Sequence, residues 1–437
     1  MTYCHIINLS NKKNFFGVVL IMNRRFSKFK FSGFVLALLV LSLAILLTAC
    51  NNNSDDKVFS SDGFSSDGIV FTLKEGNYEV TGYNGNAKNV VIPSIHQSRK
   101  VTSIADDAFS GCSEIVKIKI EGDVGYIGKS AFSGCTSLQS VSLPLWQGKI
   151  GDYAFSGCYS LQSVRINGYS VGNYAFYNCK ALTSVAIETL FIRSYAFANC
   201  TKLSDITISD EVSFLSGSAF DNTAWYNNQP DGLVYAGKIA YKYKGTMPKN
   251  TSITIKEGTK AVADYAFSRC DGLAKITFPN SLERIDNQAF EYCRGLTSVK
   301  LPEKIKDIGN YAFFSTGLKS VIIPESLESI GGCAFASCTS LTEVKWKAID
   351  CTGGYILRNG RYESYPIFRG CKNLSMIYIY KKTKKTPTFL NLLEPADSIF
   401  MDETCADITF DGTKAEWGFA RYNVRSNCKI ICSDGVY

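Results

Sequence analysis

The chain has 437 residues, of which 46% are hydrophobic and 20% are charged, and its formal net charge at pH 7 is +8. Residues 1–49 contain six lysines and arginines and no acid, so the remainder carries a net charge of only +2. This small charge argues against nucleic-acid binding, which requires clustered cations to neutralise phosphates.

The first 49 residues have the pattern of an export signal. A basic leader starts at Met22, an almost wholly apolar run covers residues 34–47, and small residues precede Cys50. An uncleaved transmembrane helix is the alternative, but the run is shorter than the roughly 20 residues that a bilayer span requires. We assign residues 1–49 to the signal, with Met22 as a candidate for the true start.

Two short segments follow the signal. Residues 50–68 are rich in Asn, Ser, Asp and Gly and poor in apolar residues, which predicts a flexible tether. Residues 69–98 are rich in Tyr and punctuated by Gly, and we expect capping strands there. A cap is needed because the first turn of any stacked array would otherwise expose apolar surface.

From Phe109 onward, the dipeptide Ala-Phe returns about every 23 residues. Counted from the Phe, a Cys usually follows after three residues, Leu or Ile after six, and Val or Ile after nine. In ten of the eleven turns an apolar residue lies five residues before the Phe. The anchor positions are Phe109, Phe132, Phe155, Phe176, Phe197, Phe220, Phe267, Phe290, Phe313, Phe335 and, more loosely, Phe368. Such a period indicates a solenoid.

Each unit contains one short alternating strand, and the stretch around Ala-Phe is too short for a full helix. A unit of this size cannot bury its own Leu and Phe, but stacked units bury them in a continuous column. The predicted fold is therefore an α/β-type solenoid of parallel short strands with turns or short helical pieces, capped at both ends.

The motif C-x-x-L-x-x-[VI]-x-[LI]-P, with A-F-x-x-C leading into the same Cys, resembles the bacterial leucine-rich repeat of the BspA type. That repeat is found in surface proteins of host-associated anaerobes and spirochaetes. The resemblance covers roughly residues 90–379, and Phe220 and Phe313 depart from it because no Cys follows them. Residues 411–417 and 432–435 resemble the segment that closes such arrays. The resemblance implies a cell-surface protein that adheres to host matrix or to other cells.

The end of the signal, Leu47-Thr-Ala-Cys50, resembles a bacterial lipobox. This resemblance implies that Cys50 becomes the first mature residue and carries lipid. Several acyl chains on one residue would give stable attachment to the membrane. The repeats would then be exported and displayed at the cell surface or outer membrane.

The doubled spacing between Phe220 and Phe267 interrupts the repeat. We assign residues 99–224 to a first repeat block and residues 225–250 to a hairpin insertion around Ala236-Gly237. A second block covers residues 251–379 and contains an insertion at 350–366, and residues 380–437 form the C-terminal cap. The two blocks form either one continuous coil or two coils at an angle.

Sixteen cysteines in an exported chain would ordinarily suggest disulfides. Nine of them share one repeat slot, which instead predicts an inward ladder of reduced thiols, because stacked Cβ atoms lie too far apart for a bridge. These are Cys112, Cys135, Cys158, Cys179, Cys200, Cys270, Cys293, Cys338 and Cys371. A disulfide within Cys333/Cys338 or within Cys428/Cys432 is an alternative for these two pairs. No metal-binding pattern is present.

The strand residues between the buried Val and Leu positions should point to one concave face. That face is rich in Ser and Thr with intermittent cations, and its candidate binding residues are Lys117, Lys119, Arg165, Lys275, Lys300, Lys345 and Tyr378. A solvated face without a ligand is the simpler interpretation. A row of tyrosines two residues before the Phe anchors either packs against the next turn or forms an exposed aromatic row.

Catalysis has little support in this sequence. His96 is the single histidine after the leader, and the chain has neither a P-loop nor an H-E-x-x-H motif. We predict a non-enzymatic, lipid-anchored surface protein without cofactors or nucleic-acid partners. Its partners would be host extracellular-matrix or bacterial surface macromolecules, and the alternative is a structural component of the envelope that does not adhere.

Overall fold

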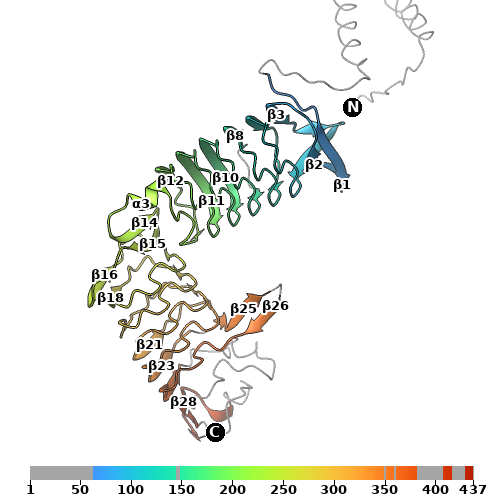
Figure 1. Ribbon diagram of the computed structural model, residues 1–437. Coiled ribbons are helices and arrows are strands. Elements are labelled where there is room, and N and C mark those ends of the chain that lie inside the picture. Colours follow the sequence, from blue (N-terminus) through green and yellow to red (C-terminus); the bar gives the residue numbers. More distant parts are fainter. Residues whose placement is uncertain are drawn as a thin grey trace, which may run out of the picture. The chain divides into compact units, whose positions relative to one another are not determined.

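The computed structural model describes residues 63–143, 148–348, 351–358, 361–380, 407–415 and 429–436 (Figure 1). All of them belong to one compact unit that spans Phe59–Tyr437. Short parallel strands stacked turn upon turn make up most of this unit, which confirms the predicted leucine-rich-repeat solenoid. The predicted signal, Cys50 and most of the predicted tether lie outside the described residues, as do parts of the predicted C-terminal cap.

A strand hairpin covers the N-terminal end of the stack. Its strands are β1 (Ile69–Lys74) and β2 (Asn77–Tyr83), which pair antiparallel. β2 pairs in parallel with β5 (Arg99–Ile104), and β4 (Ile95–His96) lies antiparallel on β5. β3 (Asn89–Ile92) pairs in parallel with the first repeat strand, β6 (Lys117–Ile120). The hairpin therefore closes the first turn, as a solenoid end requires.

Ser65 departs from the prediction, which placed it in the flexible tether. It is buried and forms a parallel bridge with Val90. The Ser65 N–H donates to Asn89 O at 3.0 Å, and Ser65 O accepts from Val91 N–H at 2.9 Å. Because β3 lies at the edge of its sheet and backbone groups need partners, the chain satisfies that edge with residues just before β1.

Each turn of the first repeat block contributes strand segments to a 13-stranded sheet. Its further strands are β7 (Tyr126–Ile127), β8 (Ser140–Ser142), β9 (Lys149–Ile150), β10 (Ser163–Val171), β11 (Ser184–Ile192), β12 (Asp205–Ile208) and β13 (Phe214–Leu215). Equivalent residues of successive turns pair in register, for example Val164 with Val185. Apolar side chains thus point inward at the same height in every turn, and Figure 1 shows the strands from β3 to β12 following one another.

The phenylalanine anchors form the centre of the core. The ten from Phe109 to Phe335 are fully buried, and Phe368 is nearly so. Within the first block, neighbouring rings stack with centroids 4.9 to 5.6 Å apart. In the second block the range is 5.0 to 5.8 Å. Each ring therefore covers the apolar face of the preceding ring and shields it from water.

The Ala-Phe stretches are hydrogen-bonded turns rather than helices. In eight of the turns the Phe N–H donates to the Ala carbonyl of the next turn, as from Phe132 to Ala154 at 2.7 Å, and the Phe335 N–H donates to Ile367 O at 3.0 Å. The residue two before each Phe, except Ser218 and Pro366, and the residue two after each Phe adopt left-handed φ angles of 54–74°. The second of these slots holds Gly or Asn throughout the first block, including Gly134 and Asn178, which are the residues that tolerate this conformation best.

The cysteine slot forms a ladder of hydrogen bonds. The buried thiol of Cys135 donates to Phe109 O at 3.2 Å, and Cys158, Cys179 and Cys200 repeat this contact one turn further each time. Cys293, Cys338 and Cys371 do the same in the second block. Thr223 and Thr316 occupy this slot where the Cys is missing. The Thr223 hydroxyl donates to Phe220 O of its own turn at 2.7 Å, and the Thr316 hydroxyl contacts Cys338 Sγ at 3.1 Å. A small donor of hydrogen bonds is what the slot requires.

All twelve described cysteines are free thiols, including Cys333 and Cys338. We therefore expect nine or more thiols to react with a thiol reagent in denaturant without reductant, against sixteen after reduction. Burial raises the pKa of Cys135 to about 12, so this thiol should be inert in the native protein at pH 7. A count of only a few reactive thiols under denaturing conditions would contradict the ladder.

The hairpin insertion joins the two repeat blocks. A short helix, α3 (Ala224–Asn227), precedes the antiparallel strands β14 (Gly232–Ala236) and β15 (Ile239–Lys244). The fully buried Tyr241 hydroxyl accepts the Phe220 N–H at 2.9 Å. This contact replaces the alanine carbonyl that accepts the equivalent Phe N–H in eight other turns. The insertion thus completes the last turn of the first block.

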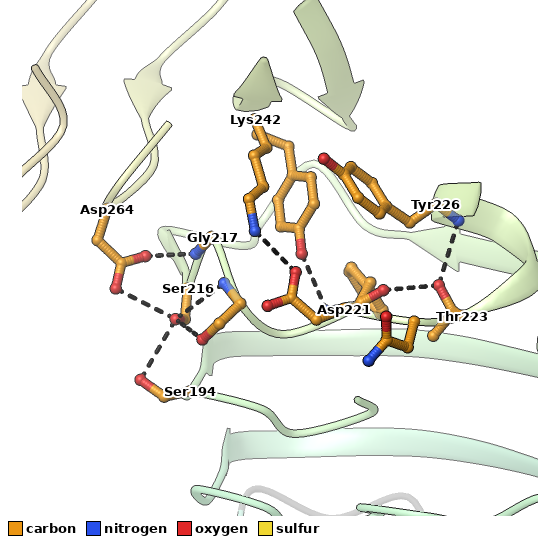
Figure 2. A network of polar contacts seen from close by, with 12 residues as sticks. Ser194, Ser216, Gly217, Asp221, Thr223, Tyr226, Lys242 and Asp264 are labelled. Atoms are coloured by element: carbon orange, nitrogen blue, oxygen red, sulfur yellow. Dashed lines mark hydrogen bonds and ion pairs between the residues drawn. The ribbon is translucent and has the colours of Figure 1, made fainter. Parts of the chain in front are cut away.

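A polar network crosses the junction between the blocks (Figure 2). The carboxylate of Asp264, in the second block, accepts hydrogen bonds from the Gly217 N–H and from the Ser216 hydroxyl at 3.1 Å. Lys242 of β15 pairs with Asp221 at 2.8 Å. Because Asp264 is buried, its two hydrogen bonds are buried polar contacts between segments about 47 residues apart in sequence.

The second repeat block resumes after the hairpin. Its strands are β16 (Thr251–Thr254), β17 (Ala261–Val262), β18 (Leu273–Thr277), β19 (Arg284–Ile285), β20 (Asp307–Ile308), β21 (Ser320–Ile323), β22 (Ser329–Ile330), β23 (Glu343–Trp346), β24 (Thr352–Gly353) and β27 (Met376–Ile379). β25 (Tyr355–Arg358) and β26 (Arg361–Ser364) form an antiparallel hairpin within the predicted insertion. β28 (Asp407–Phe410), β29 (Ile430–Cys432) and β30 (Gly435–Val436) extend the sheet beyond β27.

Candidate binding face

The candidate binding residues of the first block lie in two rows on one sheet face. Strand pairing aligns Lys117 with Ser140, and then Ser163, Ser184 and Asp205 in successive turns. The second row aligns Lys119 with Ser142, and Arg165 with Ala186 and Thr207. The residues between the rows, such as Val141, are buried. Strand alternation therefore presents a continuous strip of small polar side chains.

The strip is interrupted in the second block. Lys275 lies on β18, but Lys300 lies in a segment that forms no strand, contrary to the expected alternation. Among the described residues, no backbone hydrogen bond joins residues 298–301 to a neighbouring turn, and Lys319 N–H reaches only Thr297 O. The ladder is therefore absent at this turn, although Leu301 still points into the core.

Ion pairs neutralise three of the predicted binding cations. Lys119 pairs with Glu121 at 3.0 Å, Arg165 with Glu188 at 2.8 Å, and Lys345 with Glu343 at 3.3 Å. The Lys345 ammonium also lies 5.8 Å from the ring centre of Tyr378. By contrast, Lys117, Lys275 and Lys300 are exposed and have no ion-pair partner among the described residues. These three lysines are the cations that a ligand could contact without displacing a partner.

The face becomes more apolar toward its C-terminal end. Ile322, Lys345, Tyr378 and Thr409 align in one row across β21, β23, β27 and β28. Ile322 and Met376 are exposed there, at positions where the first block has mostly Ser, Thr and charged residues. The sheet face therefore combines a polar strip with a smaller apolar area.

The tyrosines before the Phe anchors both pack and remain accessible. Tyr153, Tyr174 and Tyr195 stack ring on ring with centroids 4.9 Å apart. Tyr153 and Tyr195 are still 38% exposed. The ring faces contact each other, so mainly edges and hydroxyls are available to solvent. Packing along the stack is thus the principal contact, in line with the predicted packing against the next turn.

Neither a catalytic arrangement nor a metal site is found in the described part of the chain. His96 stacks on Phe71 with a centroid distance of 4.0 Å and meets Tyr78 edge to face, which is a packing role. In the same residues, no group of three or more His, Cys, Asp or Glu side chains could hold a metal ion. Within the described ranges, no helix has the length and apolar character to span a bilayer.

Sequence reasoning missed a polar group beside the row of two-residue strands that includes β17, β19, β20 and β22. Asp286 directly follows Ile285, whereas Gly128, Gly151 and Gly309 follow the equivalent isoleucines of other turns. It is buried and pairs with Arg284, and burial raises its pKa to about 7. An acid in a slot that usually holds glycine is a signal that could have identified this site.

The chain matches a known family of repeat proteins. A family model described as BspA type leucine rich repeat region matches residues 85–169, 140–228 and 238–359. Among solved structures, a leucine-rich repeat protein of T. pallidum is 23% identical (TM-score 0.33; 53% of this chain and 89% of that chain covered). The pneumococcal vaccine antigen PcpA is 17% identical (TM-score 0.39; 84% and 98% covered). A leucine-rich cell surface protein of Faecalibacterium prausnitzii is 20% identical (TM-score 0.33; 81% and 96% covered). No curated protein matches the chain.

Proposed function

Because the chain belongs to the BspA-type leucine-rich repeat family, we propose that it is a bacterial surface protein that binds another macromolecule through its polar strand face. Leucine-rich repeats serve many unrelated binding tasks on one frame, so the fold itself does not name the ligand. The in-register strip of serines and lysines across β6, β8, β10, β11 and β12 carries this proposal. We further propose export through residues 1–49 and lipid attachment at Cys50.

The proposed partner is a macromolecule of the host extracellular matrix or of another bacterial surface, with acidic or polar groups along an extended segment. Two observations support this choice. Small hydroxyl side chains leave room for close approach along the strip, and the unpaired Lys117, Lys275 and Lys300 supply positive charge. Charges of this kind mainly steer encounter and select partners of opposite sign.

Charge reversal tests the proposed binding face. We expect the purified full chain to bind immobilised fibronectin or collagen saturably, and the triple variant Lys117→Glu, Lys275→Glu, Lys300→Glu to bind about tenfold or more weakly. The measurement is surface plasmon resonance at two salt concentrations, since screening should weaken the wild-type interaction. We expect the loss because the introduced glutamates would repel the acidic groups of the partner that the lysines attract.

A matched control carries the same change of charge elsewhere. Lys88, Lys202 and Lys304 are exposed and lie outside the two rows, so their reversal to Glu should leave binding almost unchanged. Equal loss in both triple variants would assign the effect to net charge rather than to this face. An absence of saturable binding to matrix and to bacterial surfaces would favour a structural role in the envelope.

A further inference from the structure

A hollow of about 310 Å³ lies at the C-terminal end of the stack, across β27, β28 and β29. Its volume is at the lower end of the roughly 300–1,000 Å³ that is typical of small-ligand sites. Backbone hydrogen bonds between successive turns fix its frame, such as the one from Asp411 N–H to Ile379 O at 3.0 Å. The side chains that define it are those of Tyr378, Tyr380, Thr409, Asp411, Ile431 and Ser433.

Two tyrosine rings form one wall of the hollow. The ammonium of Lys345 lies over the ring of Tyr378, 5.8 Å from its centre, and that of Lys347 lies over the ring of Tyr380 at 5.7 Å. Both lysines belong to the neighbouring turn on the β23 side, so the other face of each ring is turned away from β23 and toward β28. The two tyrosines are two residues apart, about 6.6 Å along an extended chain. The hollow therefore offers two aromatic faces side by side.

Polar side chains line the rest of the hollow. The Thr409 hydroxyl, the Asp411 carboxylate and the Ser433 hydroxyl have no hydrogen-bond partner among the described residues. A carboxylate only accepts hydrogen bonds, whereas a hydroxyl both donates and accepts them. A ligand that fills the hollow must therefore supply hydrogen-bond donors to Asp411 as well as an apolar surface to the tyrosines.

The charge around the hollow is balanced. Burial raises the pKa of Cys432, which also lines the hollow, and Asp434 raises it further whereas Lys414 lowers it, so both of these charges lie near. The charged side chains at or beside the hollow are thus Asp411, Asp434, Lys347, Lys414 and the ion-paired Lys345 and Glu343. Since the acids and the cations are equal in number, electrostatic complementarity favours a neutral ligand over an anion or a cation.

We propose that this hollow binds a neutral carbohydrate, a short chain of hexose units whose C–H faces lie on the rings of Tyr378 and Tyr380 and whose hydroxyls donate to Asp411. The face of an aromatic ring carries partial negative charge, so it attracts the weakly positive C–H groups of a sugar. Proline-rich peptides also bind to aromatic-lined surfaces, but proline has no N–H to donate to the carboxylate. The site does not involve Lys117, Lys275 or Lys300, so carbohydrate binding goes beyond the function proposed for the polar strip.

The test is isothermal titration calorimetry of the purified full chain with maltotetraose, cellotetraose and mannotetraose. We expect at least one of the three to bind saturably. Tyr378→Ala and Tyr380→Ala should each weaken that binding about tenfold, whereas the phenylalanine variants should keep it within about threefold because the ring faces remain. Asp411→Leu should also weaken binding about tenfold, and Asp411→Asn should weaken it less because the amide oxygen still accepts.

Tyr169→Ala is the matched control. Tyr169 is an exposed tyrosine of the first block with Lys149 over its ring at 5.3 Å, so its removal repeats the change away from the hollow. This variant, and the reversal of Lys117, Lys275 and Lys300, should leave sugar binding unchanged. Circular dichroism verifies folding of each variant.

Three outcomes would overturn the proposal. The first is that none of the three sugars binds. The second is that Tyr378→Ala and Tyr380→Ala bind as well as wild type, or that Tyr169→Ala loses as much binding as they do. The third is saturable binding of a decaproline peptide in place of any sugar, lost in the same two alanine variants, which would assign the hollow to peptide.

Discussion

Replacing Phe176 by alanine is expected to lower the free energy of unfolding by about 3–5 kcal/mol. Phe176 is fully buried, and its ring stacks between Phe155 and Phe197 with centroids 5.0 and 5.2 Å away. Its removal therefore leaves a cavity and breaks two ring contacts, each worth roughly 0.5–1.5 kcal/mol beyond buried area. Denaturant unfolding followed by far-UV circular dichroism measures the effect.

Tyr159 provides the matched control for this prediction. It is 45% exposed and contacts Lys180 through a cation–π interaction at 5.5 Å. Its replacement by alanine removes a comparable side chain but should cost at most about 1 kcal/mol. Since turns interact mainly with their neighbours, the Phe176 variant should also broaden the transition by uncoupling the two sides of the stack. Equal costs for the two variants would refute the central column.

The interior of the stack was predictable because burial is decided by position in the repeat. One turn cannot shield Phe155 or Leu161 alone, so the register alone places both side chains inside. The hydrogen bonds of the cysteine slot were not predictable in the same way. They depend on where Phe O of the preceding turn points, which is a property of the left-handed turn and not of the pattern.

The candidate binding face was predictable only in part. Alternation put Lys119 and Lys345 on the face, and the same alternation puts Glu121 and Glu343 beside them, so these neutralising pairs could have been read from the sequence. The partner of Arg165 is one turn away and required the register between β10 and β11.

Asp264 contributes the other large effect on stability, and Asp264→Ala is expected to cost about 2–3 kcal/mol. The carboxylate is buried and accepts the Gly217 N–H and the Ser216 hydroxyl (Figure 2). Its removal leaves the Gly217 N–H without this partner, whereas the Ser216 hydroxyl keeps its contacts with Ser194 and Ser218. Urea unfolding at pH 7 measures the loss. Asp264→Asn keeps an acceptor oxygen and should cost clearly less than alanine.

The pH dependence of the stability of wild type and of Asp264→Asn tests the role of the Asp264 carboxylate. Burial raises the pKa of Asp264 in the folded protein, against the lowering effect of the Gly217 and Ser216 hydrogen bonds. The protonated form is therefore favoured on folding, and the resulting stability is greatest below the unfolded pKa of 3.8 and declines as pH rises through the folded pKa. Relative to Asp264→Asn, wild type should thus lose stability between about pH 4 and the folded pKa. An unchanged difference across this range would contradict the raised pKa of Asp264. An alanine variant as stable as wild type would show that Asp264 does not hold the two repeat blocks together.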